Sequence, residues 1–358
     1  MTEALNLTVS RADLSVADVK SEALSPLADG QARLKVNAFS ITANNLTYAV
    51  FGDMMQYWNF FPAPEGRGRV PVWGFATITE SRAPGLAEGR KVYGYLPMST
   101  AFTVDAGAVK SGGFNDMAAH RQPMSPFYNQ YVFTDTDPLY ASDTEALQML
   151  FRPLFTTAFL IDDFIDDNKM FGAKQVIFSS ASAKTAWAAA LQIAARGIPV
   201  IGLTSKRNVA FTESLGCYAK VVTYDDIEKL DAGTPSVFVD IAGDAAVRSR
   251  IHTHFNDALK YSCSVGATHW QEGTRAPEKL SGPEPQFFFA PGQIAKRIGD
   301  WGGQVFGEKV AAAWAQFLPV AGRVTRIVER DGLSEAVKIF QSFVNGSASA
   351  DEGYIVRV

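Results

Sequence analysis

The sequence predicts an α/β protein in which a doubly wound parallel sheet is combined with a second, β-rich domain. A strand–turn–helix–strand unit spans 173–207, and further short apolar runs alternate with helical segments after it. Before residue 135, strand signals are separated by Pro, Gly and acidic residues. The chain of 358 residues is long enough for two domains, and we expect them to be 1–135 with 319–358, and 136–318.

The central unit begins with the apolar run 176–178, which is too short for a helix and indicates a buried strand. A polar turn, 179–182, precedes an alanine-rich helix over 185–195, which Gly197–Pro199 ends. A second apolar run, 200–203, follows directly. Because this spacing forms a right-handed parallel crossover, the free N–H groups at the start of the helix are expected to form an anion pocket.

The residues around this pocket favour NADP(H) over NAD as the cofactor. About twenty residues past the turn, many such units carry an acidic residue for the ribose hydroxyl, whereas this chain has Thr204 followed by a basic stretch. That stretch consists of Ser205, Lys206 and Arg207, and it suits a 2′-phosphate. The Gly-x-Gly-x-x-Gly pattern is absent, so hydroxyls and a lysine would replace its backbone contacts. The turn region is occupied by Ser180, Ala181, Ser182, Lys184 and Thr185. The alternative is a crossover whose turn holds no ligand.

Composition and charge argue against several classes of partner. The content of 47% hydrophobic and 20% charged residues is that of a globular protein, and a net charge of −4 offers no basic surface for nucleic acid. There is no apolar stretch of about eighteen residues and no signal-peptide pattern, so we expect no membrane contact and a cytoplasmic location. The partner is expected to be an apolar small molecule.

Metal binding is not expected either. Two cysteines and four histidines without a Cys-x-x-Cys spacing are too few for a zinc lobe. The pair His252 and His254 is interpreted as a polar helix surface. The acidic residues of 162–167 are likewise interpreted as a solvated face.

The N-terminal region is predicted to form a small barrel from strands that include 31–39, 74–79 and 90–95. Between the first two strands, 41–64 is rich in aromatic residues that follow no regular period. This segment is either a satellite core or the wall of an apolar ligand pocket. Its aromatic residues are Tyr48, Phe51, Tyr57, Trp58, Phe60 and Phe61.

The segment 110–131 is polar and irregular, and loops of this length are often functional. Its last residues include Tyr128, Asn129 and Tyr131, which are candidates for substrate contacts. The alternative is a turn whose tyrosines pack on the barrel.

The remaining elements extend the crossover into a sheet. Helices are expected over 143–164 (divided at Pro153), 209–215, 244–259, 307–318 and 333–344. Strands are expected over 220–224, 237–241, 261–265, 286–289, 323–328 and 354–358. Because the carboxyl ends of parallel strands line the ligand crevice, further cofactor neighbours are predicted. They are Tyr224, Ala242, Gly243 and Gly266.

This order of parts resembles the medium-chain dehydrogenase/reductase superfamily, in its zinc-free quinone oxidoreductase and enoyl reductase branch. The resemblance covers most of the chain and rests on 32–52, 70–76, 88–94 and the closing 333–358. It implies a Rossmann-type NADP-binding domain beside a GroES-like substrate or catalytic domain. Segments that look peculiar to a subfamily are 128–131, 179–185 and 152–157, the last of which contains the candidate cofactor contact Thr157.

The resemblance also implies catalysis without zinc. Zinc-dependent members carry a cysteine in the first loop and Gly-His-Glu in the next, where this chain has 43–45 (Ala-Asn-Asn) and 73–75 (Trp-Gly-Phe). In zinc-free relatives a first-loop tyrosine lies near the nicotinamide, and Tyr48 matches it. The implied activity is NADPH-dependent reduction of an activated double bond or carbonyl in an enal, enone or quinone.

In such a reaction a tyrosine hydroxyl would polarise the carbonyl or supply the proton. Tyr48 is the first candidate, followed by Tyr131 and Tyr57. Asn44 or Asn45 would hold the substrate oxygen or the nicotinamide ribose.

The unusual turn and the lack of a strong acid/base pair also fit another class, a catalytically silent NADP(H)-binding sensor or scaffold protein. The sequence leaves open which substrate is used and in which direction. It also leaves open whether the chain forms a homodimer through 287–289, as relatives of the superfamily often do.

Overall fold

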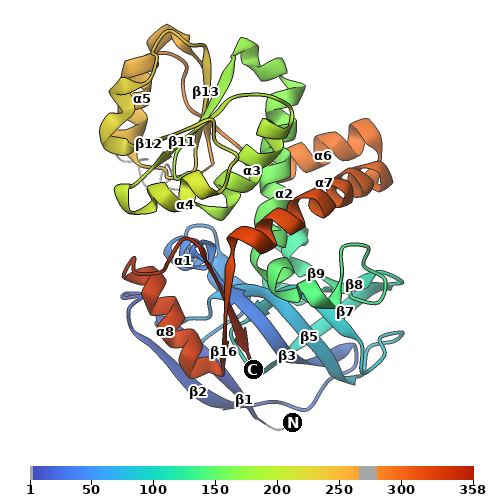
Figure 1. Ribbon diagram of the computed structural model, residues 1–358. Helices are drawn as coiled ribbons and strands as arrows, with labels where there is room; N and C mark the ends of the chain where they lie inside the picture. Colours follow the sequence, from blue (N-terminus) through green and yellow to red (C-terminus); the bar gives the residue numbers. More distant parts are fainter. Residues whose placement is uncertain (1–2, 266–279) are drawn as a thin grey trace. The chain divides into compact units, whose positions relative to one another are not determined.

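The computed structural model describes residues 3–265 and 280–358 (Figure 1). The chain divides into two compact units, 1–150 with 325–358 and 151–324. These divisions fall later in the chain than the bounds expected from the sequence. The predicted class, an α/β protein with a parallel sheet and a β-barrel, is confirmed.

The first unit contains a closed antiparallel barrel. Its strands pair in the order β3 (Gln31–Ile41), β5 (Pro71–Ser81), β6 (Lys91–Pro97), β9 (Gln130–Phe133), β8 (Gly113–Asp116) and β7 (Ala101–Lys110). The barrel closes because β7 also pairs with the first half of β3. The second half of β3 pairs with β17 (Glu352–Arg357), which in turn pairs with β16 (Arg326–Asp331). The end of the chain therefore returns to this unit.

Further elements of the first unit surround this barrel. A small antiparallel sheet consists of β1 (Glu3–Ser10), β2 (Ala17–Ala23) and β4 (Arg67–Gly68). Helix α8 (Leu333–Val344) has the bounds predicted from its apolar period. Helix α1 (Ala43–Val50) lies in the aromatic segment, where no regular element was expected.

Glycine at position 74 is required by the packing of β3 against β5. A Cβ atom added there would lie 2.2 Å from the Ala38 carbonyl oxygen. Gly74 pairs with Phe39, and the strand register shifts shortly before this pair, between Val36 and Ala38. The close approach fixes Trp73, the neighbouring residue on β5, which is buried.

The second unit is built on a parallel sheet. Its strand order is β12 (Lys220–Thr223), β11 (Val200–Thr204), β10 (Gln175–Phe178), β13 (Ser236–Asp240), β14 (Leu259–Ser264) and β15 (Gln286–Phe287). The crossover from β10 through α3 (Lys184–Ala195) to β11 confirms the predicted strand–helix–strand unit. Adjacent residues Val176, Ile177 and Phe178 are all fully buried, as expected for a strand covered on both faces.

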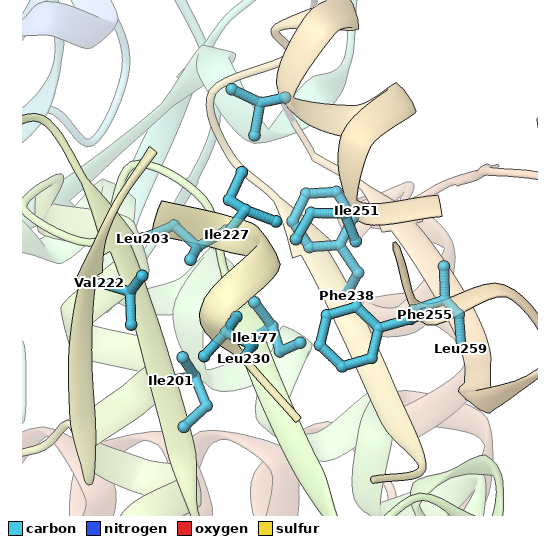
Figure 2. Close-up of a cluster of buried hydrophobic side chains, with 11 residues drawn as sticks. Ile177, Ile201, Leu203, Val222, Ile227, Leu230, Phe238, Ile251, Phe255 and Leu259 are labelled. Carbon is cyan, nitrogen blue, oxygen red and sulfur yellow. The ribbon is translucent and has the colours of Figure 1, made fainter. Parts of the chain in front are cut away.

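Two apolar layers cover the sheet of the second unit. Figure 2 shows one of them, in which Ile177 and Phe238 from the strands pack with Ile251 and Phe255 of α5 (Ala245–Phe255). The other contains Trp187 of α3, whose ring stacks 5.2 Å from that of Phe317 in α7 (Gly303–Val324). Helices on both faces are the arrangement of a doubly wound sheet.

Helix α2 (Glu145–Asp167) runs without interruption, so the division predicted at Pro153 is wrong. Proline removes one N–H donor and leaves the carbonyl four residues earlier without its helical partner. That carbonyl belongs to Met149, and it accepts a hydrogen bond from the Ser40 hydroxyl at 2.7 Å. An outside donor thus replaces the missing helical bond.

All four aspartates at the end of α2 pair with cations, and only Asp166 and Asp167 are exposed as the predicted solvated face requires. Asp163 accepts hydrogen bonds from Arg297 Nε (2.7 Å) and Gln293 Nε2 (2.6 Å). Both donors lie on α6 (Ala290–Trp301), a helix that the sequence analysis missed. Arg196, at the end of α3, pairs with Asp162 at 2.6 Å.

Candidate functional site

The second unit brings most of the predicted cofactor residues to one edge of its sheet. The strands β10 to β13 are parallel neighbours, so the residues after each strand share that edge. They include Ser180, Ala181, Ser182, Ser205, Lys206, Arg207, Tyr224, Ala242 and Gly243. Thr157 is half-buried in the middle of α2, and Gly266 lies outside the described residues.

Two tyrosines hold the turn after β10. The Ser180 backbone has φ of +51°, a left-handed conformation that glycine usually adopts. Its N–H donates to the Tyr224 hydroxyl oxygen at 2.9 Å. The Tyr218 hydroxyl donates to the Ala181 carbonyl oxygen at 2.8 Å. Side-chain hydroxyls therefore fix a turn that glycines form in related crossovers.

One glycine does serve this turn, although it lies on the neighbouring strand. A Cβ atom added to Gly202 of β11 would come within 2.9 Å of the Ala181 Cβ and 3.0 Å of the Tyr218 ring. The turn therefore packs directly on the β11 backbone. This glycine is in mid-strand, which explains why a search of the turn for the usual pattern does not find it.

A buried carboxylate ties the turn to the end of β13. The Ser179 hydroxyl donates to Asp240 Oδ1 at 2.7 Å and accepts the Ala242 N–H at 2.9 Å. Asp240 Oδ1 also accepts the Gly243 N–H at 2.9 Å, and its other oxygen faces Arg248 at 3.4 Å. Asp240 therefore has a structural role in holding the backbone of this edge. Sequence reasoning missed the role of Ser179.

The start of α3 has the features of an anion site. Its N-cap residue, Ala183, offers no side-chain cap to the first N–H groups, and Lys184 lies in the first turn. Lys206 is exposed and pairs with Asp225 at 2.8 Å, an interaction that raises the pKa of Lys206 and keeps it cationic. Because this ion pair is solvent-exposed, it contributes little to stability.

The first unit contains a second candidate site, a group of four tyrosine rings that we call the tyrosine cluster. Its members are Tyr48 of α1, Tyr57 of the 3₁₀ helix η1 (Tyr57–Asn59), Tyr95 of β6 and Tyr128 of the 3₁₀ helix η3 (Pro126–Asn129). The ring centroids of Tyr48 and Tyr57 are 4.7 Å apart, and those of Tyr95 and Tyr128 are 4.8 Å apart. Trp73 and Phe60 pack against the cluster.

Two side-chain donors orient the Tyr48 hydroxyl within the tyrosine cluster. Tyr48 Oη accepts hydrogen bonds from Asn44 Nδ2 at 2.7 Å and Trp73 Nε1 at 3.4 Å. Burial raises the pKa of all four hydroxyls, with the charge of neighbouring tyrosines adding to the effect at Tyr48, Tyr95 and Tyr128. They therefore remain protonated hydrogen-bond donors at neutral pH.

Two of the predicted residues occupy supporting places instead. Tyr131 is fully buried, and its hydroxyl donates to the Tyr95 carbonyl oxygen at 2.8 Å. Asn45 Nδ2 donates to the Pro71 carbonyl oxygen at 2.8 Å and anchors α1 to β5. The structure thus groups Tyr48, Tyr57 and Asn44, adds Tyr95 and Tyr128, and leaves Tyr131 in the barrel wall.

The described residues contain no group of three or more His, Cys, Asp or Glu side chains that could hold a metal ion. The interpretation of His252 as a surface residue is wrong: it is buried, and its ring nitrogens contact the Ser281 carbonyl and the Ser262 hydroxyl. Burial raises the pKa of the free thiols Cys217 and Cys263 to about 12. Among the helices in 3–265 and 280–358, none combines the length and apolar character that crossing a bilayer requires.

Several solved structures are similar in fold to this chain. They include crystal structures of CurA from Vibrio vulnificus with NADPH (TM-score 0.66, 12% identity) and of the yhdH oxidoreductase from Salmonella enterica with NADP (0.56, 14%). A structure of the quinone oxidoreductase from Coxiella burnetii is also similar (0.55, 15%), and each of the three matches over 99% of both chains. The chain therefore has the fold of the medium-chain dehydrogenase/reductase superfamily, as the sequence resemblance indicated.

Within that fold, the chain belongs to the family whose model it matches over most of its length. Residues 39–349 match the family model described as "Protein of unknown function (DUF2855)". No curated protein sequence matches the chain.

Proposed function

We propose that this protein is an oxidoreductase that uses NADPH, without zinc, to reduce an activated double bond or carbonyl of an apolar small molecule such as an enal, enone or quinone. The observation that carries the proposal is the Tyr48 hydroxyl, which is held by Asn44 and Trp73 among aromatic rings and kept protonated by burial. A fixed, neutral donor of this kind can polarise a carbonyl oxygen.

The second unit supplies groups that fit the cofactor. The start of α3, which has no side-chain cap, suits the pyrophosphate, and Lys206 with Arg207 suits a 2′-phosphate at the end of β11. Two proteins of similar fold, CurA and yhdH, were crystallised with NADPH and NADP. When bound, the cofactor would supply a hydride to the electrophilic carbon.

The protein's own residues have separate tasks in this proposal. Tyr48 donates a hydrogen bond to the substrate oxygen, and Asn44 keeps the Tyr48 hydroxyl oriented. Tyr57 and Tyr128 are half-buried, so they form the part of the tyrosine cluster that is partly accessible. The aromatic surroundings favour an apolar substrate.

A catalytically silent NADP(H)-binding sensor or scaffold is the second candidate. One observation favours it: the Tyr224 hydroxyl already engages the Ser180 N–H, a backbone donor of the turn where the pyrophosphate would bind. In that case the cofactor would bind but would not be consumed.

Titration of NADPH fluorescence with the purified protein, followed by NADPH oxidation with a panel of enals, enones and quinones, separates the two candidates. Binding with turnover supports the reductase. Binding without turnover across the panel favours the sensor, and no binding contradicts both.

We further propose that the protein forms a homodimer through β15, the last strand in the sheet of the second unit. Phe287 of β15 and Phe289, two residues further on, are 46% and 61% exposed, which is unusual for phenylalanine. Analytical ultracentrifugation of wild type and Phe289→Asp tests this assembly, and a wild-type monomer would contradict it.

A further inference from the structure

The buried guanidinium of Arg121 contacts two backbone carbonyls and one hydroxyl next to the tyrosine cluster. Arg121 lies at the end of the 3₁₀ helix η2 (Ala119–Arg121) and is 1% exposed. Its Nε donates to the Phe60 carbonyl oxygen at 3.2 Å and its Nη1 to the Tyr128 carbonyl oxygen at 3.4 Å. Its Nη2 lies 3.5 Å from the Tyr131 hydroxyl. The contacts are long, so their number and directions matter more than the strength of any one.

Each contact leads to a different tyrosine of the cluster. Phe60 ends the η1 turn that carries Tyr57, so its carbonyl holds that turn. The Tyr128 carbonyl belongs to the cluster residue itself. The Tyr131 hydroxyl donates to the Tyr95 carbonyl oxygen at 2.8 Å and so extends the link to β6. Tyr57, Tyr95 and Tyr128 therefore share one support, although they lie far apart in the sequence.

A buried carboxylate fixes the guanidinium in turn. Asp116 Oδ2 lies 3.1 Å from Arg121 Nε, and both side chains are nearly inaccessible. Asp116 also accepts the backbone N–H groups of Asp105 (3.2 Å) and Ala118 (3.0 Å), which attach it to β7 and to the start of η2. The Phe61 ring covers the guanidinium, with its centroid 4.5 Å from Arg121 Cζ.

We propose that Arg121, fixed by Asp116, is a positioning residue that sets the arrangement of Tyr57, Tyr95 and Tyr128 in the tyrosine cluster. Because it is buried, Arg121 acts through these residues and not on the substrate. The catalytic part of the proposal rests on the reductase function proposed above, whereas the structural part does not.

The variant Arg121→Lys separates this role from general stability. Lysine keeps the charge beside Asp116, but its single ammonium cannot reach three acceptors that lie in different directions. Arg121 also borders a cavity of about 180 Å³, which gives the shorter side chain room for hydration. The variant is therefore expected to fold.

The matched control is Arg67→Lys. Arg67 also joins an aspartate, Asp18, to a backbone carbonyl, that of Thr8, but it touches no residue of the tyrosine cluster. If Arg121→Lys fails to unfold cooperatively, Tyr131→Phe is the second variant, because it removes only the hydroxyl link between Arg121 and Tyr95.

Nitration of tyrosines by tetranitromethane, mapped by peptide mass spectrometry, needs no enzymatic activity. We expect Tyr57 and Tyr128 to be nitrated several-fold faster in Arg121→Lys than in wild type or Arg67→Lys. In turnover assays we expect kcat to fall about tenfold to a hundredfold with unchanged NADPH affinity. For Tyr131→Phe, the expected result is a lower kcat than that of wild type.

Nitration rates of Tyr57 and Tyr128 that match wild type in Arg121→Lys would overturn the positioning role. If the wild-type protein shows no turnover, the reductase proposal fails while the nitration result still decides the role of Arg121. Wild-type kcat together with faster nitration would overturn the catalytic part alone.

Discussion

The Ser40 hydroxyl donates a hydrogen bond to the Met149 carbonyl oxygen, the acceptor that Pro153 deprives of its helical N–H. Ser40 is 3% exposed, so water is not a ready substitute. A buried carbonyl without a partner costs free energy comparable to a lost hydrogen bond.

We therefore expect Ser40→Ala to lower the free energy of unfolding by about 1 to 3 kcal/mol. Urea titration followed by circular dichroism measures the change. Ser21→Ala, which removes an exposed hydroxyl from β2, is the control and should change stability by less than about 0.5 kcal/mol. Equal effects of the two substitutions would contradict the role assigned to Ser40.

Replacement of Tyr48 by phenylalanine tests the proposed reacting hydroxyl. Removal of the donor should lower kcat by about a hundredfold or more, because a positioned acid group typically contributes that much. The affinity for NADPH should stay the same. Steady-state kinetics with the best substrate of the panel measures both quantities.

Tyr140→Phe is the matched control for Tyr48→Phe. The Tyr140 hydroxyl donates to Glu145 at 2.6 Å, away from the tyrosine cluster. This control should retain wild-type turnover. If Tyr48→Phe also retains it, Tyr48 is not the group that polarises the substrate.

The basic residues after β11 are expected to select NADPH. Lys206→Ala or Arg207→Ala should weaken NADPH binding about tenfold and leave NADH binding unchanged, because only NADPH has the 2′-phosphate. Fluorescence titration with both cofactors gives the ratio. Lys229→Ala removes a similarly exposed lysine, paired with Asp226 at 2.7 Å, and should have no effect. If neither Lys206→Ala nor Arg207→Ala changes the ratio of NADPH to NADH affinity, these residues do not bind the 2′-phosphate.

Tyr224→Phe tests whether a hydroxyl supports the turn after β10. Without it, the Ser180 N–H loses its acceptor and the left-handed backbone of Ser180 is less well held. We expect weaker NADPH binding and a loss of about 1 kcal/mol in stability. The double variant Ser180→Gly/Tyr224→Phe should recover binding, since glycine adopts this backbone conformation without strain. Tighter NADPH binding in the single variant would show that Tyr224 obstructs the cofactor.

Buried His252 should make stability depend on pH. Burial lowers the pKa of His252 from its usual value, so the unfolded chain binds a proton that the folded chain resists. The neutral, buried His252 contributes fully to the free energy of unfolding above the unfolded pKa of about 6.5, and this contribution declines as the pH falls below that value. Urea titrations between about pH 7.5 and pH 5 should show a shallower decline for His252→Gln than for wild type. Substitution of the exposed His120 by Gln should keep the wild-type slope.

The sequence predicted those parts of the fold that depend on local periodicity. The crossover of β10, α3 and β11 and the bounds of α8 follow from apolar runs and an amphipathic period. Strand β7 was not predicted, and one of its partners, the first half of β3, lies far away in the chain. Strands β1 and β2 were also missed, although they pair with each other across a short loop. Pro153 misled the prediction of α2, since the donor that replaces its missing bond is over a hundred residues away.

In the candidate sites too, residues in a distinctive local segment were predicted, whereas residues brought in by tertiary contacts were not. Tyr48 and Tyr57 were found because they lie in a conspicuously aromatic segment, but Tyr95 looks like any residue of a barrel strand. The pairing of β6 with β5 places Tyr95 opposite Trp73 and so brings it to the tyrosine cluster. The roles of Tyr218 and Tyr224 in the turn depend on β12 lying beside β11, which no local pattern indicates.

The pairing of β17 with residues Ala38 to Ile41 of β3 has a consequence for synthesis on the ribosome. Translation delivers all of 151–324 before β17, so the parallel sheet of the second unit can fold while that half of β3 still lacks a strand on one side. The nascent barrel then carries an open edge of unpaired backbone groups, which is the kind of surface that chaperones protect from aggregation.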